Sequence, residues 1–128
     1  MFIDLYGYQN LILFIARIVL GITFIKHGWP KIKQPLGMKT WLAEMRFPVP
    51  AALSVMVALV EFFGGWAVLA GVYLQEAALL IAADMLVATF VKRFNLKKNW
   101  VDGFELDLAL LGLALMLALY GAGDWALL

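Results

Sequence analysis

The chain has 128 residues, of which 65% are hydrophobic and only 15% are charged, and its formal net charge at pH 7 is +1. An average soluble domain carries about 25% charged residues, so this composition is typical of a protein that lies mostly in lipid. The length allows one domain of several spanning helices, which we place at residues 1–128. The charge does not indicate nucleic-acid binding, and the absence of cysteine excludes disulfides, thiolate metal sites and thiol chemistry by this chain alone.

Four apolar segments are long enough to cross a bilayer as helices, because a span needs ~20 residues. They cover residues 10–29, 51–71, 74–92 and 104–121. None alternates apolar and polar residues as a strand does, and in lipid only helices or closed barrels satisfy their own backbone hydrogen bonds. The sequence therefore predicts an all-α polytopic membrane protein built as a four-transmembrane-helix bundle.

The first connection contains a further helical pattern. Its apolar residues follow i, i+3, i+4, i+7 spacing, at Met38, Trp41, Leu42 and Met45. This spacing predicts a short amphipathic helix that lies in the cytoplasmic interface. A surface helix packed on the bundle is an equally open interpretation.

Basic residues are concentrated in two of the three connections. The first connection holds Lys31, Lys33, Lys39 and Arg46, and the third holds Lys92, Arg93, Lys97 and Lys98. The N-terminal tail, the second connection and the C-terminal tail have no Lys or Arg. By the positive-inside rule, we expect loops one and three in the cytoplasm and both termini on the outer side of the cell membrane.

Ionisable residues near the middle of three spans predict an intramembrane polar layer: Arg17, Glu61 and Asp84. A charge there costs at least ~2.5 kcal/mol, so Arg17 should face the bundle and find a carboxylate. Because Glu61 lies on a stripe of small residues that allows close approach, we expect it to pair with Arg17. One interpretation is an ion pair that only fixes helix register, with Asp84 neutral and hydrogen-bonded. In the other interpretation, the three residues of this layer form a binding site.

A second, cytoplasmic-side polar layer is expected ~14 Å further along the bundle, at 1.5 Å of rise per residue. It contains Lys26 and His27 from the first span and Glu105 and Asp107 from the fourth. A structural explanation is also open, in which Lys26 extends to the headgroups and the two acids favour a helix N-terminus. We identify no catalytic residue and no metal site. Haem is disfavoured because His27 is the sole histidine.

Several short motifs occur in order along almost the whole chain. They are Arg17, Leu20-Gly21, Phe24, His27-Gly28 and Lys31; Pro48-Val49-Pro50; Glu61, Gly64-Gly65 and Gly71; Met85 and Ala88; Gly103-Phe104-Glu105; and Gly121-Ala122-Gly123. In order and spacing, these motifs resemble the DoxX family of small four-helix membrane proteins. The resemblance implies a link to quinone-coupled respiratory complexes, or to membrane assemblies that handle oxidative stress with soluble partners.

Function is open between different classes. In the favoured hypothesis the chain is an integral membrane subunit or scaffold of a membrane redox complex, not catalytic alone, whose basic loops bind membrane or soluble redox subunits. In the alternative, the polar layers form a quinone or proton site, with Arg17 and His27 as donors to quinone carbonyls. A small-molecule or ion transporter is a third hypothesis, since intramembrane ionisable residues also mark such paths. The scaffold is favoured because nothing in the sequence supplies an electron carrier. A homo-oligomer stays open.

Overall fold

The computed structural model of the protein describes residues 4–127, and every regular element among them is helical. The elements are η1 (Tyr6–Tyr8), α1 (Gln9–Lys33), α2 (Lys39–Glu44), α3 (Pro50–Ala70), α4 (Leu74–Phe90), η2 (Val91–Asn95), η3 (Trp100–Phe104) and α5 (Glu105–Tyr120). Four segments are long and apolar enough to span a membrane: Tyr6–Lys33, Pro50–Ala70, Leu74–Asn95 and Trp100–Tyr120. The predicted all-α membrane bundle is confirmed.

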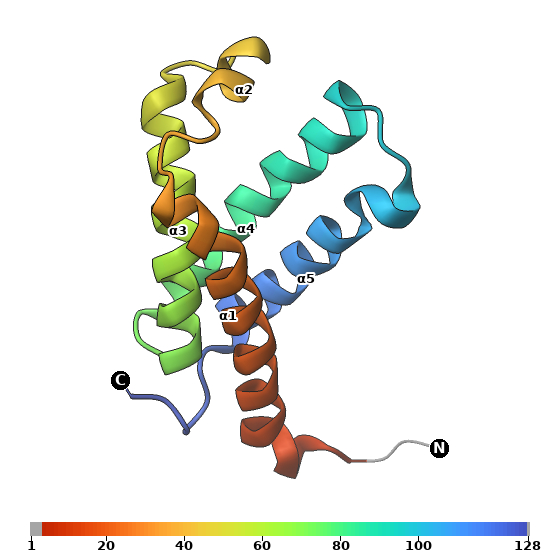
Figure 1. Cartoon of the computed structure of the whole chain (residues 1–128). Coiled ribbons are helices and arrows are strands. Elements are labelled where there is room, and N and C mark those ends of the chain that lie inside the picture. Colours follow the sequence, from red (N-terminus) through yellow and green to blue (C-terminus); the bar gives the residue numbers. More distant parts are fainter. Residues whose placement is uncertain (1–3, 128) are drawn as a thin grey trace.

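The long helices form two antiparallel pairs, α1 with α3 and α4 with α5. The pairs meet at the end of the bundle that holds the C-terminal segment, and they diverge toward the opposite end (Figure 1). We call that opposite end, which carries connections 34–49 and 91–104, the basic end. Where the pairs meet, the core is apolar, and its fully buried members are Leu20, Phe24, Val68, Ala78, Ile81, Ala114 and Leu117.

Glycine lets α1 and α3 approach each other closely. A Cβ atom added to Gly21 would lie 2.8 Å from the Gly65 carbonyl oxygen, and one added to Gly28 would lie 2.5 Å from the Phe62 backbone nitrogen. Small residues give membrane helices this kind of close contact. The same contacts set the antiparallel register, because they place the second half of α1 beside the middle of α3.

The first span ends one turn later than the sequence predicts. Although Pro30 lacks a backbone N–H, its ring fits the helix, and α1 continues to Lys33. It ends where Gln34 leaves the helical region at φ −132° and ψ 76°, since the residue before a proline, here Pro35, is disfavoured in α geometry. The extra turn carries Lys31 toward α3.

The predicted short helix in the first connection is α2. Leu42 is buried and Trp41 is partly buried, so this helix packs on the bundle, mainly against α3. Ser54 anchors the connection: its hydroxyl donates to the Pro35 carbonyl oxygen at 2.6 Å and accepts from the Met38 N–H at 3.2 Å. The structure therefore favours the surface helix packed on the bundle.

Candidate functional site

Arg17 lies where the two helix pairs meet and is 1% exposed. Its guanidinium donates only to backbone carbonyl oxygens: Nε to Val68 at 3.1 Å, Nη2 to Leu69 at 2.8 Å, and Nη1 to Ala122 at 3.2 Å and Trp125 at 2.6 Å. Two of these carbonyls belong to the last turn of α3, where helical carbonyls have no intrahelical partner and the helix dipole is negative. A helix end therefore takes the place of the expected carboxylate.

The predicted pair between Arg17 and Glu61 is wrong. Glu61 accepts hydrogen bonds from Lys31 Nζ at 2.8 and 2.7 Å, and its side chain is 3% exposed. The prediction assumed that the first two spans begin and end at matching depths, but α1 has 25 residues and α3 has 21. With Gly28 packed against Phe62, the residue one turn further along α1 meets Glu61, and Arg17 lies near the end of α3 instead.

The C-terminal segment 121–127 is held across the ends of α1 and α3. Asn10 and Asp124 exchange hydrogen bonds of 2.9 and 3.0 Å. The Trp125 ring packs edge-on against Phe14 at 5.3 Å, and the Leu127 N–H donates to the Ala70 carbonyl oxygen at 2.9 Å. Together with the Arg17 contacts, these bonds make this end of the bundle a structural joint.

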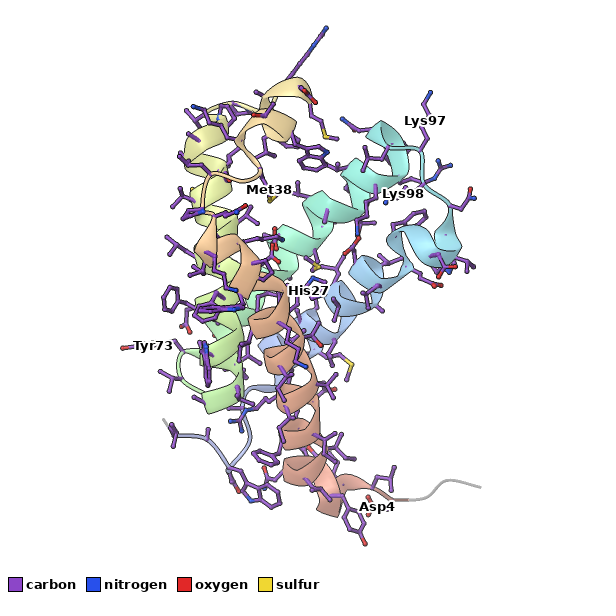
Figure 2. All side chains as sticks on the ribbon, in the orientation of Figure 1. Asp4, His27, Met38, Tyr73, Lys97 and Lys98 are labelled. Atoms are coloured by element: carbon purple, nitrogen blue, oxygen red, sulfur yellow. The ribbon has the colours of Figure 1, made fainter. Side chains whose placement is uncertain are left out.

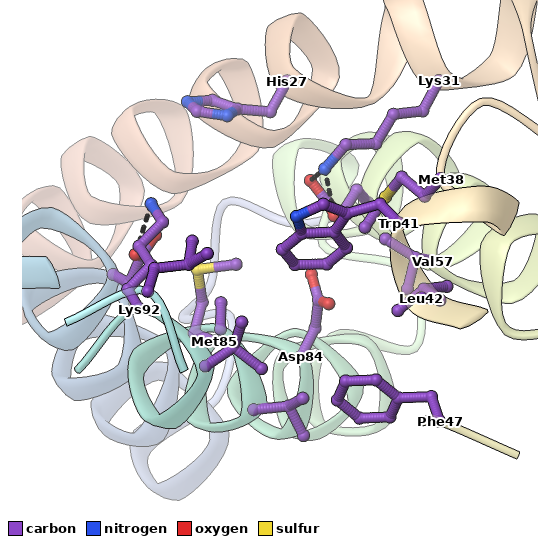
Figure 3. Close-up of a pocket in the computed structure, with 16 residues that line it drawn as sticks. His27, Lys31, Met38, Trp41, Leu42, Phe47, Val57, Asp84, Met85 and Lys92 are labelled. Atoms are coloured by element: carbon purple, nitrogen blue, oxygen red, sulfur yellow. Dashed lines mark hydrogen bonds and ion pairs between the residues drawn. The ribbon is translucent and has the colours of Figure 1, made fainter. Parts of the chain in front are cut away.

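A cavity of about 210 Å³ lies at the other end, between the diverging helix pairs and beside α2. Charged and polar groups from all four long segments and from α2 line it: His27, Lys31, Trp41, Glu61, Asp84, Lys92 and Asp107. The structure thus places Glu61 and Asp84 in the same cavity, whereas Arg17 does not line it. Figure 3 shows the Asp84 carboxyl pointing to the side of the cavity where the Lys31 amine lies.

Of the three acidic residues that line this cavity, Asp84 is the one without an ion-pair partner in the described part of the chain. It lines the cavity together with Glu61, whose two carboxylate oxygens both accept hydrogen bonds from Lys31. Within residues 4–127, the buried Asp84 Oδ2 has no hydrogen-bond partner. A buried polar atom without a partner costs about 1–3 kcal/mol, so Asp84 is a group that a bound donor would satisfy.

The predicted second layer is divided by the structure. His27 and Asp107 line the cavity, and Asp107 Oδ2 lies 2.6 Å from Lys92 Nζ. Glu105 instead accepts a hydrogen bond of 3.3 Å from the Asp102 N–H in the turn before α5. Lys26 is exposed and forms no ion pair with the described part of the chain. Lys26 and Glu105 therefore lie outside the cavity lining, and the extension of Lys26 to the headgroups stays a prediction.

Sequence reasoning missed Lys31 and Lys92 as site residues, although helical spacing could have found them. Lys31 follows His27 by four residues, and Lys92 follows Asp84 by eight, so each shares a helix face with a residue already singled out. Both lysines were counted with the basic connections, because the predicted spans end at residues 29 and 92.

The lining determines what the cavity can accept. It holds two amines, on Lys31 and Lys92, and three carboxyl groups, on Glu61, Asp84 and Asp107. The carboxyl groups outnumber the amines, and both amines are paired with carboxylates, so the lining has no free cation for an anionic ligand and suits a compact neutral group with hydrogen-bonding atoms. The volume is below the ~300–1,000 Å³ of pockets that enclose a drug-sized ligand, so the cavity fits a headgroup and not a whole large molecule.

The fold and composition define a small multi-pass membrane protein with a four-helix bundle. The DoxX family matches residues 12–93, which include most of α1, all of α2, α3 and α4, and every cavity residue named above except Asp107. Over 118 residues, the chain is 32% identical to the Inner membrane protein YqjF of Escherichia coli (strain K12), covering 88% of this chain and 86% of that protein. No solved structure matches the chain significantly. The chain belongs to the DoxX family, as the sequence motifs predicted.

Proposed function

We propose that this DoxX protein is a membrane subunit of a quinone-linked redox assembly and that its cavity binds the quinone headgroup. The observation that carries the proposal is the half-buried Asp84, whose buried Oδ2 has no hydrogen-bond partner among the described residues and which shares the cavity with the Lys31–Glu61 pair. A quinone ring presents carbonyl acceptors, and its reduced form presents hydroxyl donors. Lys31 and the Trp41 indole are donors for the first, and Asp84 is an acceptor for the second.

A binding site explains the cavity better than a scaffold alone does. Protein interiors are close-packed, and burying a carboxyl without a partner is unfavourable, so a purely structural bundle gains nothing from either feature. The Arg17 joint and the close α1–α3 contact provide the structural role at the other end and along α3. A quinone takes up protons when it is reduced, and we propose that the carboxyl groups of Glu61 and Asp84 supply these protons.

The chain is proposed to act with partner subunits and not to be catalytic alone. Its side chains include no cysteine, and His27 is the sole histidine, so electrons must come from a redox partner. The cavity opens near the connections that carry most of the basic residues, and Lys97 and Lys98 lie at the end opposite Asp4 (Figure 2). By the positive-inside rule we place this basic end in the cytoplasm and propose that the partner docks there.

Quinone binding is testable in nanodiscs with a quinone that carries a single isoprenoid unit. Because quinones quench indole fluorescence and Trp41 lines the cavity, titration should give saturable quenching that Trp41→Phe reduces. Asp84→Asn should weaken binding, whereas Asp102→Asn, an exposed acid outside the cavity, is the matched control. Quenching that does not saturate, or that is equal in all variants, contradicts the proposal. An optical spectrum and an analysis of co-purified lipids would show whether quinone or haem accompanies the protein.

A further inference from the structure

A second hollow adjoins the cavity on the outer face of the bundle, between α3 and α4. Its volume is about 280 Å³. Its lining is apolar except for Asp84, and the other members are Leu42, Leu53, Phe47, Met56, Val57, Val60, Leu80, Ala83 and Val87. We call this hollow the lateral groove. Met56 and Leu80 are each 56% exposed, so the groove opens toward the surroundings of the bundle, which in a membrane are lipid chains.

The lateral groove and the polar cavity share walls. Leu42, Phe47, Val57, Asp84 and Val87 line both. Asp84 therefore lies at the junction, and Figure 3 shows Leu42, Val57 and Phe47 grouped on one side of its carboxyl. A molecule with its polar end at Asp84 would have an apolar path from that point to the lipid.

We propose that the lateral groove holds the hydrocarbon tail of the ligand and is its passage from the bilayer, a proposal that rests on the headgroup site above. The ligand class is then a single-chain amphiphile with a compact, neutral, hydrogen-bonding headgroup. The lateral groove lies between α3 and α4 and offers a single apolar path, which suits a ligand with one hydrocarbon tail.

Charge separates this class from phospholipids. The cavity lining has more carboxyl groups than amines, and Lys31 and Lys92 are each already paired with a carboxylate. A phosphate would meet Glu61 and Asp84 without a free cation to balance it, and like charges at short range repel. A neutral ring with oxygen substituents brings no such charge.

The lateral groove should affect how the ligand reaches the cavity more than how tightly the ligand binds there. A tail that leaves lipid for an apolar groove gains little, because the lipid is as apolar as the groove wall. Blocking the groove should therefore exclude long-chain ligands by steric overlap, while a short-chain quinone still reaches the cavity from its open side.

The test compares two bulky substitutions on α4 in nanodiscs. Ala83 is exposed and lines only the groove, whereas Leu86 is exposed and lines neither hollow. Ala83→Phe should weaken binding of a decyl-chain quinone about tenfold, a change of ~1.4 kcal/mol, and should leave binding of the one-isoprenoid quinone unchanged. Leu86→Phe should change neither. Met56→Trp, which fills the groove from α3, should reproduce the effect of Ala83→Phe.

The outcomes distinguish the two proposals. If the short-chain quinone binds but Ala83→Phe and Met56→Trp leave decyl-chain binding unchanged, the groove proposal fails and the headgroup site stands. Equal weakening of both ligands also overturns the groove proposal, because the substitution then acts through the cavity. If the native protein binds neither quinone, both proposals fail. Retained short-chain binding shows that each variant is folded.

Discussion

Arg17 Nη1 donates a hydrogen bond of 2.6 Å to the backbone carbonyl oxygen of Trp125, 108 residues further along the chain. The same guanidinium also donates to the carbonyl oxygens of Val68 and Leu69 at the end of α3. One side chain thus joins three parts of the molecule that are distant in sequence. The charge is compensated by backbone dipoles, and this leaves Glu61 available for Lys31.

Replacing Arg17 should destabilise the bundle without requiring any change at Glu61. Arg17→Gln should lower the free energy of unfolding by ~3 kcal/mol, because it removes charged donors and leaves buried carbonyl oxygens without partners. Thermal unfolding in detergent measures the change, with the exposed Arg93→Gln as the control. In addition, the exchange Arg17→Glu with Glu61→Arg should not restore stability. Recovery in that double variant would show that the two residues do pair.

The Lys31–Glu61 pair should show direct energetic coupling. A double-mutant cycle with Lys31→Met and Glu61→Gln should give a coupling energy of ~2 kcal/mol, since close charge pairs that share a hydrogen bond are not additive. Unfolding in denaturant monitored by circular dichroism would supply the values. The comparison cycle combines Arg17→Gln with Glu61→Gln and should be additive within ~0.5 kcal/mol.

Asp84 should matter more for ligand binding than for stability. Because its Oδ2 has no hydrogen-bond partner among the described residues, Asp84→Asn should change the free energy of unfolding by less than ~1 kcal/mol. Binding of the short-chain quinone should weaken in the same variant. A variant that fails to fold while binding is unaffected in the folded fraction would assign Asp84 a structural role instead.

Gly71 should tolerate no side chain. Its φ of +75° is unfavourable for other residues, and an added Cβ atom would lie 2.5 Å from the Ala126 Cβ and 2.9 Å from Arg17 Nη2. Gly71→Ala should therefore destabilise the protein by about 1–3 kcal/mol. The matched control is Gly112→Ala in α5, where nothing lies within 4 Å and the alanine should be neutral or stabilising by about 0.5–1 kcal/mol. Equal melting temperatures of the two variants would contradict this explanation of the joint.

The membrane orientation can be tested with single cysteines, since the native chain has none. Positions 39, 97 and 124 are all exposed in the structure, so only the side of the membrane should decide whether a cysteine there reacts. In intact cells, cysteines at Lys39 and Lys97 should resist an impermeant thiol reagent, and one at Asp124 should react. Labelling after membrane permeabilisation should reach all three and serves as the control. The opposite pattern in intact cells would invert the proposed topology and would move the redox partner to the other side.

The sequence by itself determined the number and approximate bounds of the spans, the short helix α2 and the family. Long apolar runs in a chain that is 65% hydrophobic leave few alternatives to membrane helices. The face of α3 that packs inward was also readable, because Ser54, Ala58, Glu61 and Gly65 recur at helical spacing and all are buried. These features depend on local composition and periodicity.

Only the tertiary structure decided which charges meet. Depth along the membrane is inferred from span limits, but the close glycine contacts between α1 and α3 set the register of these two helices. That register places Arg17 beside Val68, seven residues from Glu61, and it brings Lys31 to Glu61 instead. The return of segment 121–127 to Arg17 has no periodic signal, since its hydrogen bonds to Arg17 use backbone carbonyl oxygens that every residue carries. Likewise, the cavity exists because two helix pairs diverge beneath α2, which depends on packing between segments far apart in the chain. Local pattern places a residue on a helix face, and packing between helices decides what that face meets.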